Sequence, residues 1–188
     1  MPLTTIDPGA ALVVVDLQKG VVSALTDAQV MAAVKQATHL ATEFRRHGLP
    51  VILVNVTGRA PGRTDTHRSP NTTSPPAGWA DLIDELDVRP TDHLITKRRR
   101  SAFHDTGLDT LLRDLGVTQV VLTGIATSSG VESTARSASD HGYHVVLATD
   151  AMGDPDPEAH RHSVERVFPK LGETASTAEV VDMVEATR

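Results

Sequence analysis

The sequence contains no cysteine and few aromatic residues. Without cysteine, the chain has no disulfide bonds, no thiolate metal ligands and no thiol nucleophile. Its aromatic content is only 3%, and its formal net charge is −6. An acidic chain with so few aromatic side chains is poorly suited to follow phosphates or to stack on bases. We therefore expect no nucleic-acid partner.

The chain also lacks the segments that direct proteins to membranes or across them. No apolar run approaches the roughly 20 residues that a membrane-spanning helix requires. The N-terminal stretch "MPLTTIDPGA" has neither the basic region nor the apolar region of a secretion signal. These absences predict a cytoplasmic protein with no membrane partner.

Hydrophobic residues make up 39% of the 188 positions, enough for one globular domain over residues 1–188. Short apolar runs rich in β-branched residues predict buried strands at 11–16, 50–56, 93–97, 119–125 and 144–151, with a weaker sixth at 173–175. These runs do not alternate with polar residues, which is typical of parallel strands covered on both faces.

Segments of helical periodicity lie between the predicted strands. They cover residues 27–47, 108–115, 129–141 and 157–168, and a last helix starts at Ser176 or Thr177 and reaches about residue 186. Alternating strands and helices predict an α/β fold, with a doubly wound parallel sheet between two helical layers. The longest irregular segment, residues 59–77, is rich in Pro, Gly, Ser and Thr, and loops of this length are often functional.

Ligands of open parallel sheets bind beyond the carboxyl ends of the strands. Asp16 follows the first predicted strand, Lys97 ends the third, and the stretch "TGIATSSG" (residues 123–130) follows the fourth. An acid, a cation and a backbone turn that opens a helix are therefore predicted to meet at one edge of the sheet. The other strand-end residues are Gln18, Asn55, Thr57, Asp150 and Met152.

Three motifs in this order resemble the isochorismatase-like hydrolases, also called the cysteine hydrolase family. They are "VVVDLQKG", "ITKRRRSAF" and "VVLTGIATSSGVESTARSASDHGYHVVLATDAM", and the resemblance runs from about Ile6 to Val181. It implies a Rossmann-like sheet of six parallel strands. Amidase members of this family use an Asp–Lys–Cys triad, whose positions correspond to Asp16, Lys97 and Gly130 of this chain.

Glycine at position 130 departs from the amidase pattern. It forms no thioester, so the covalent route is closed. Ser128 and Ser129 lie one or two residues before this position, where a side chain points elsewhere, so we expect neither to act as nucleophile. True isochorismatases resemble this chain in carrying glycine there, and they hydrolyse a vinyl ether by protonation and water addition. The resemblance thus implies that Asp16 is a general acid.

The resemblance also implies the remaining parts of the site. Substrate contacts are expected from Gln18, Phe103, Ile125, Thr127 and Ser129. Backbone donors are expected at Ala126 and Gly130, with a cis peptide bond between Ile125 and Ala126. Apart from the resemblance, Arg59, Arg63 and Arg99 are candidates for binding a substrate carboxylate because they lie near this edge of the sheet.

No metal or other cofactor is expected. Asp65 and His67 resemble two metal ligands of nicotinamidases, but the rest of that ligand set is missing. His160 and His162 are two residues apart on a predicted helix and therefore face different directions.

Three functions stay open at this stage. The first is a non-covalent hydrolase of the isochorismatase type, and the second is an amide hydrolase in which Asp16 activates a water. The third is a non-catalytic binding protein that retains the pocket. In each case the partner is a small molecule, and the family resemblance implies a homodimer.

Overall fold

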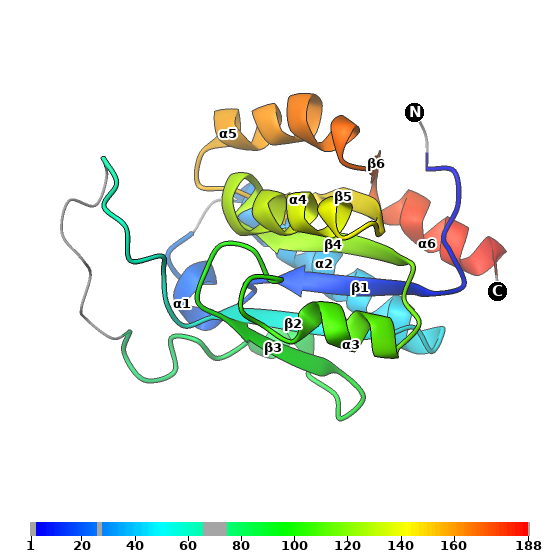
Figure 1. The fold of residues 1–188 in the computed structure, drawn as a ribbon, viewed down its shortest axis with the longest axis horizontal. Coiled ribbons are helices and arrows are strands. Elements are labelled where there is room, and N and C mark those ends of the chain that lie inside the picture. Colours follow the sequence, from blue (N-terminus) through cyan, green and yellow to red (C-terminus); the bar gives the residue numbers. More distant parts are fainter. Residues whose placement is uncertain (1–2, 26–27, 66–74, 188) are drawn as a thin grey trace.

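The computed structural model describes residues 3–25, 28–65 and 75–187. A six-stranded parallel sheet runs through the centre of the molecule, with the strand order β3-β2-β1-β4-β5-β6 (Figure 1). The strands are β1 (Ala10–Val15), β2 (Val51–Val56), β3 (His93–Lys97), β4 (Gln119–Ile125), β5 (His144–Gly153) and β6 (Glu173–Ala175). The predicted α/β fold is confirmed, including its short sixth strand.

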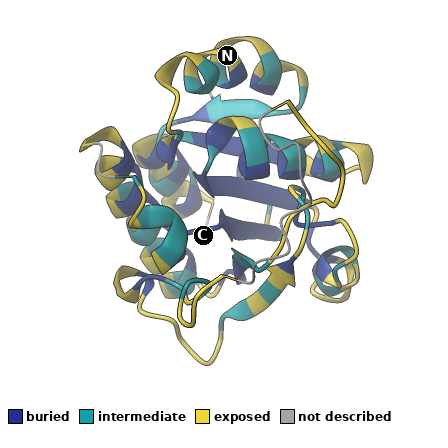
Figure 2. Ribbon diagram, turned by 90° about the vertical axis from the view of Figure 1, so that its left-hand side faces the viewer, coloured by how far each residue is buried: buried dark blue, intermediate teal, exposed yellow. Residues whose placement is uncertain are grey.

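The apolar runs do not alternate with polar residues because both faces of the sheet are covered. Every residue of β1 is buried. Leu12 and Val14 belong to the core on one face, whereas Val13 and Val15 belong to the core on the other. The sheet consequently lies as a buried layer between two layers of helices (Figure 2).

Helices α2 (Ala28–Arg46) and α6 (Thr177–Ala186) cover one face of the sheet, and α3 (Leu108–Asp114) and α4 (Glu132–Asp140) cover the other. Two further α-helices are α1 (Lys19–Val22) and α5 (Pro157–His162). No helix within the described ranges combines the length and the hydropathy needed to cross a bilayer.

Several helix boundaries differ from the prediction. The helix expected from residue 129 begins as a π-helix, η2 (Thr127–Val131), before α4, and the helix expected at 157–168 becomes α5 followed by the π-helix η3 (Ser163–Val167). The remaining short elements are the 3₁₀-helices η1 (Asp84–Leu86) and η4 (Phe168–Lys170). α6 begins with a capping box between Ser176 and Glu179. Neither α1 nor η1 was predicted, because each is too short to show a helical period.

The strand order reverses at β1. The chain proceeds from β1 to β2 and β3 on one side, then crosses back to β4 on the other side of β1. Such a reversal opens a crevice at the carboxyl ends of the two central strands, where ligands of open α/β sheets bind. Asp16 follows β1 and η2 follows β4, so the topology brings both to this crevice.

Candidate active site

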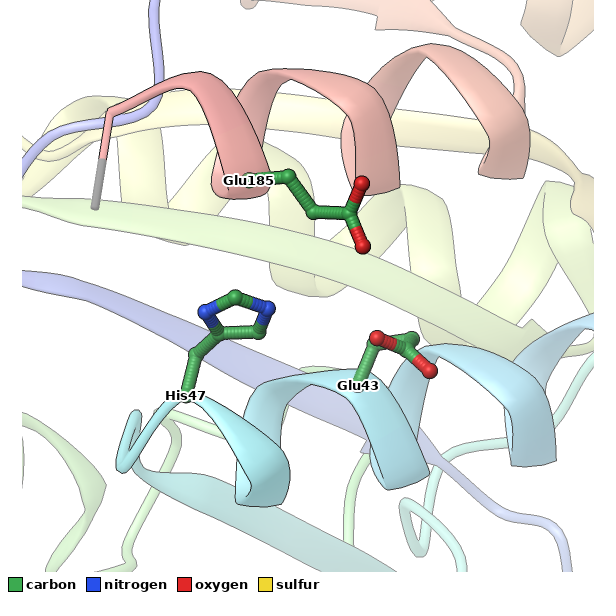
Figure 3. Close-up of side chains that lie close together, drawn as sticks. All are labelled: Glu43, His47 and Glu185. Carbon is green, nitrogen blue, oxygen red and sulfur yellow. The ribbon is translucent and has the colours of Figure 1, made fainter.

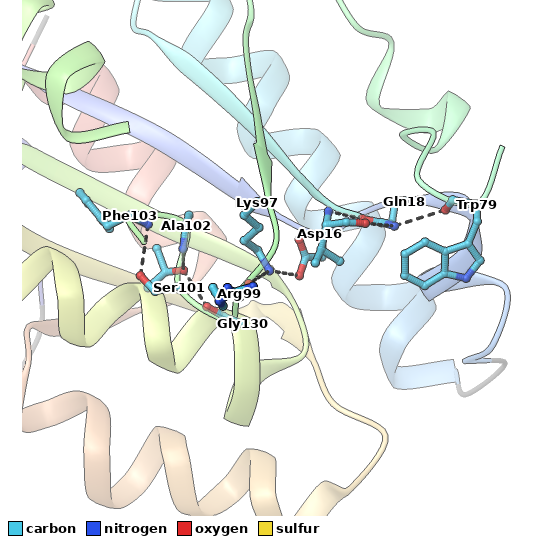
Figure 4. Close-up of polar contacts among 11 residues, drawn as sticks. Asp16, Gln18, Trp79, Lys97, Arg99, Ser101, Ala102, Phe103 and Gly130 are labelled. Atoms are coloured by element: carbon cyan, nitrogen blue, oxygen red, sulfur yellow. Dashed lines mark hydrogen bonds and ion pairs between the residues drawn. The ribbon is translucent and has the colours of Figure 1, made fainter. Parts of the chain in front are cut away.

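Asp16 and Lys97 form a buried ion pair at the carboxyl end of the sheet. Lys97 Nζ lies 2.7 Å from Asp16 Oδ2, and the two residues are 2% and 6% exposed, respectively. Lys97 Nζ also donates to the carbonyl oxygen of Arg99 at 3.2 Å. Asp16 has a φ of 54°, in the left-handed region that Asp tolerates better than most residues. Figure 4 shows the pair between the Arg99 backbone and Gln18.

The environment of Asp16 raises the pKa of its carboxyl toward neutral pH. Burial raises the pKa of this carboxyl to about 6, although the Lys97 ammonium opposes the shift through its charge and its hydrogen bond. Asp16 Oδ1 is buried without a hydrogen-bond partner among the described residues, so Lys97 is the main compensation for a charged Asp16. Such a carboxyl exchanges its proton near neutral pH, as a general acid or base requires.

The missing side chain of Gly130 leaves a narrow gap beside this ion pair. A Cβ atom added at this position would lie 3.1 Å from Asp16 Oδ2, 3.1 Å from Val15 Cγ1 and 3.6 Å from Lys97 Nζ. The Gly130 carbonyl accepts a hydrogen bond from Thr134 Oγ1 at 2.7 Å, and this hydroxyl accepts one from the Ala102 N–H at 3.0 Å. The backbone at Gly130 is therefore held in place, with little room for a side chain beside the ion pair.

The space opens into a cavity of about 540 Å³, a size typical of small-molecule sites. The lining residues that this argument uses are Asp16, Lys97, Trp79, Ile125, Ala126, Ser129, Gly130 and Pro155, together with Arg59, Arg63, Arg99 and Arg100. Among the described residues of this lining, Asp16 is the single acid, against one lysine and four arginines. This described part of the lining is positive, although the chain as a whole is acidic.

The four cavity arginines differ from most other arginines of the protein. Six arginines elsewhere pair with carboxylates: Arg45, Arg46, Arg89, Arg113, Arg136 and Arg161. Within the part of the chain that the structure describes, none of the cavity arginines forms an ion pair. Arg99 instead donates to the carbonyl oxygens of Arg59 and Arg98. The cavity thus offers guanidinium groups that have no acid partner among residues 3–25, 28–65 and 75–187.

Most of the predicted site residues in the turn after β4 lie at the cavity, as expected. Ile125, Ala126, Ser129 and Gly130 line the cavity, and the Ile125–Ala126 peptide bond is cis. The three arginines expected to bind a carboxylate also line it. The assignment of roles to these residues stays a prediction.

Gln18 and Thr127 are not part of the cavity lining, contrary to expectation. The Gln18 side chain is fully buried and bonds to the backbone N–H and carbonyl of Val56 and to the Trp79 carbonyl. Thr127 is also fully buried, and its hydroxyl contacts the Gly153 carbonyl and the His160 ring. Both polar groups are occupied by the protein itself, so they position the walls of the site.

Phe103 also lies outside the described cavity lining, and its expected contact with a substrate stays a prediction. Its ring stacks on His141 with the centroids 5.0 Å apart and packs against Tyr143. Phe103 follows Ala102, whose N–H supports the Gly130 turn through Thr134. The "SAF" segment therefore holds the backbone of the site, and its aromatic side chain belongs to the core.

Two of the other strand-end residues serve the fold. The Asp150 carboxylate accepts hydrogen bonds from the N–H and the hydroxyl of Thr177, at the start of α6. Met152 is buried in the core that covers the α3 and α4 face. β5 continues to Gly153, two residues beyond its predicted end, so neither residue reaches the cavity.

From the sequence alone, Trp79 belongs either to the core or to the pocket wall, and neither Gly20 nor Pro155 is placed at the site; all three line the cavity. The ring of Trp79 lies directly against the backbone of Gly20, where an added Cβ would come within 1.9 Å of Trp79 Cδ1. Trp79 and Gly20 are 59 residues apart in the chain, so no local pattern joins them. Pro155 lies two residues beyond β5, and the extra length of that strand is the signal that places it here.

One cluster outside the cavity has the residue types of a metal site. Glu43 of α2 and His47, which directly follows α2, lie near Glu185 of α6, with one ligand atom of each within 4.8 Å of the others (Figure 3). Arg46, however, donates to both carboxylates at 2.6 Å. A guanidinium already compensates the two acids, so this cluster is an ion-pair contact between α2 and α6. Of the loop candidates, Asp65 is exposed and His67 lies outside the described residues.

Comparison with known proteins agrees with this geometry. A family model described as the isochorismatase domain matches residues 10–179. The chain is 38% identical over 179 residues to the uncharacterized isochorismatase family protein YwoC of Bacillus subtilis, covering 93% of each chain. It is also 38% identical to the structure of an isochorismatase family protein from Burkholderia thailandensis, with a TM-score of 0.90 and 98% of each chain covered.

A further similar structure is the N-carbamoylsarcosine amidase from Thermoplasma acidophilum. It is 28% identical, with a TM-score of 0.75, and the match covers 89% of this chain and 96% of that one. The family match over most of the chain and the two full-length relatives lead to one conclusion: this chain belongs to the isochorismatase family of hydrolases.

Proposed function

We propose that this protein hydrolyses a small vinyl ether that carries carboxylate groups, without a covalent intermediate and with Asp16 as the general acid. The observation that carries this proposal is the buried Asp16–Lys97 pair beside the narrow gap at Gly130. The pair supplies a proton donor, and the space admits a reacting carbon where a side chain would exclude it.

The reaction requires one proton and one water. The Asp16 carboxyl transfers its proton to the terminal vinyl carbon, and the ether oxygen stabilises the resulting cation as an oxocarbenium ion. Water adds to the cationic carbon and returns a proton to Asp16. The hemiketal then breaks its C–O bond, giving an alcohol and a 2-oxo acid, so the net change is the addition of one water. No step needs a nucleophilic side chain.

Substrate binding supports the acid role of Asp16. In the free protein its pKa of about 6 leaves only about a tenth of the carboxyl protonated at pH 7. A bound carboxylate close to Lys97 offsets the lysine charge that otherwise lowers the pKa of Asp16. The substrate therefore increases the protonated fraction of the acid that it needs.

The cavity arginines support a substrate with more than one carboxylate. Arg59, Arg63, Arg99 and Arg100 line the cavity and have no acid partner among the described residues. The planar guanidinium group matches a carboxylate through two parallel hydrogen bonds. A dicarboxylate such as isochorismate supplies the negative charge that these four groups lack.

Amide hydrolysis is the second candidate, favoured by the similarity to N-carbamoylsarcosine amidase. In this reaction the ionised Asp16 acts as a base, and a water in the Gly130 space attacks the carbonyl carbon. The Lys97 ammonium then stabilises the developing negative charge. Both reactions use the same residues, but they require opposite protonation states of Asp16.

The test is turnover of isochorismate by the purified protein in D₂O, with N-carbamoyl amino acids as the parallel substrates. We expect a 2-oxo acid with one deuterium in its methyl group, because the acid delivers a solvent-derived deuteron. Release of ammonia from the N-carbamoyl compounds, without 2-oxo acid from the vinyl ether, would establish the amide reaction instead. Binding without either product would identify a non-catalytic member.

A further inference from the structure

The turn that carries Gly130 has to be positioned closely. Ser129 and Gly130 belong to η2, which follows β4 and lines the cavity. A Cβ at Gly130 would already lie 3.1 Å from Asp16 Oδ2, so a shift of the turn toward β1 closes the space that a substrate needs. A π-helix is a rare element that is frequently found at functional sites. Contacts on the far side of η2 therefore matter for the active site.

Thr127, the first residue of η2, makes such a contact. Its side chain is completely buried, and its hydroxyl donates to the Gly153 carbonyl oxygen at 3.1 Å. The Thr127 hydroxyl oxygen also lies 2.8 Å from Nδ1 of His160, on α5. Because the hydroxyl proton is directed to Gly153, the imidazole is the donor in the second bond. This role requires the tautomer with a proton on Nδ1.

The surroundings of His160 are compatible with this donor role. Burial lowers the pKa of the imidazole, and the Asp154 carboxylate opposes that shift. The neutral ring has a single N–H, and its hydrogen bond to Thr127 selects the nitrogen that carries the proton. His162, two residues further along α5, is exposed and faces a different direction.

A second contact at the same turn is more exposed. The backbone N–H and the hydroxyl of Ser128 both donate to Asp154 Oδ2 at 2.7 Å. Water competes for these groups at the surface, so their bonds add little net stability. Water does not reach the buried hydroxyl of Thr127. Loss of the His160 N–H therefore leaves the Thr127 oxygen buried with one hydrogen bond fewer.

We infer that His160 is a positioning residue for the active site: through the Thr127 hydroxyl it holds η2 so that Gly130 keeps the space beside Asp16 open. His160 touches neither Asp16 nor the cavity. Its expected effect is on the turnover step, whereas the arginines that bind the substrate are untouched. This inference rests on the proposed function for its effect on catalysis, but its effect on the turn is measurable without a substrate.

The experiment compares three variants in the full-length protein. His160→Leu removes the donor at similar volume, and His160→Asn restores an N–H near the position of Nδ1. His162→Leu is the matched control on the exposed side of the same helix. For each, amide hydrogen exchange of residues 127–131 is measured in the free protein, and kcat and KM are measured on the substrate identified above.

We expect His160→Leu to increase exchange in η2 about tenfold and to lower kcat about tenfold, with KM changed less than twofold. His160→Asn and His162→Leu should stay within about threefold of the wild type in both measurements. Unchanged exchange in η2 of His160→Leu overturns the inference whatever the substrate is. Faster exchange with unchanged kcat also overturns it, because the turn would then position nothing. If the wild type does not hydrolyse a vinyl ether, the proposed function is wrong. The hydrogen-exchange result still tests the role of His160 in holding η2, because it needs no substrate.

Discussion

The floor and the mouth of the cavity carry their charges in opposite ways. At the floor, Asp16 and Lys97 are buried and paired at 2.7 Å, and the pKa of the acid is raised. At the mouth, Arg59, Arg63 and Arg100 are exposed, Arg99 is half-buried, and none of the four has an acid partner in the described structure. Burial makes the floor suitable for moving a proton, whereas exposure leaves the mouth cations available for a ligand. Each exposed charge contributes little by itself, so several are needed.

The largest effect is expected from Asp16→Asn. The amide keeps the size of the side chain and tolerates the positive φ, but it has no proton to transfer. We expect kcat to fall at least about 100-fold, the lower end for loss of a general acid. The measurement is steady-state turnover of the vinyl ether, with circular dichroism to verify folding.

Asp105→Asn is the matched control, because Asp105 has the same φ of 54° but is exposed and distant from the cavity. It should keep wild-type activity. Full activity in Asp16→Asn would show that Asp16 is not the general acid of the reaction.

A substitution at the mouth should affect binding more than turnover. In Arg99→Gln we expect KM to rise about thirtyfold, from the loss of about 2 kcal/mol of charge-assisted hydrogen bonding, with kcat changed less than threefold. Arg161→Gln, on α5, is the control for removal of an arginine charge. A fall in kcat as large as that of Asp16→Asn would mean that the mouth takes part in the chemistry and would end the distinction between the two regions.

Gly130→Ala tests the space at the floor directly. The added methyl lies 3.1 Å from Asp16 Oδ2 and occupies the place proposed for the reacting carbon. We expect kcat to fall about tenfold, a loss of about 1.4 kcal/mol in transition-state stabilisation. Gly107→Ala is the control, since nothing lies within 4 Å of the added atom there. Wild-type kinetics in Gly130→Ala would show that this space is not used.

The smallest effects are expected from the serines of η2. Ser128→Ala and Ser129→Ala should each lose less than about tenfold in activity, because the proposed reaction has no covalent step. The measurement is kcat for each variant, together with mass spectrometry of the protein during turnover. A covalent adduct on either serine, or a loss comparable to that of Asp16→Asn, would replace the non-covalent mechanism.

The fold and the floor of the cavity could be predicted from the sequence because their signals are local. Continuous apolar runs marked the strands, and the strand-end rule placed Asp16 and Lys97 at one edge of the sheet. The family resemblance identified position 130 as the one that departs from the amidase pattern. It also implied the cis bond after Ile125, which the structure confirms.

The walls could not be predicted because they depend on contacts between distant segments. Phe103 and Thr127 were expected to face the ligand, but tertiary packing directs the first into the core and the second toward His160. Trp79 reaches the cavity because Gly20 leaves room for its ring. The homodimer implied by the family resemblance stays a prediction, as a single chain is described.

The most direct test of the central claim is the pH dependence of kcat/KM for the wild-type protein on its vinyl ether substrate. A general acid is active in its protonated form, and kcat/KM reports the pKa of the free protein. With the pKa of Asp16 raised to about 6, we predict that kcat/KM is high at low pH and falls above about pH 6, approaching a tenfold loss per pH unit. An activity that instead rises with pH through this range would show that Asp16 acts as a base, and would contradict the acid mechanism.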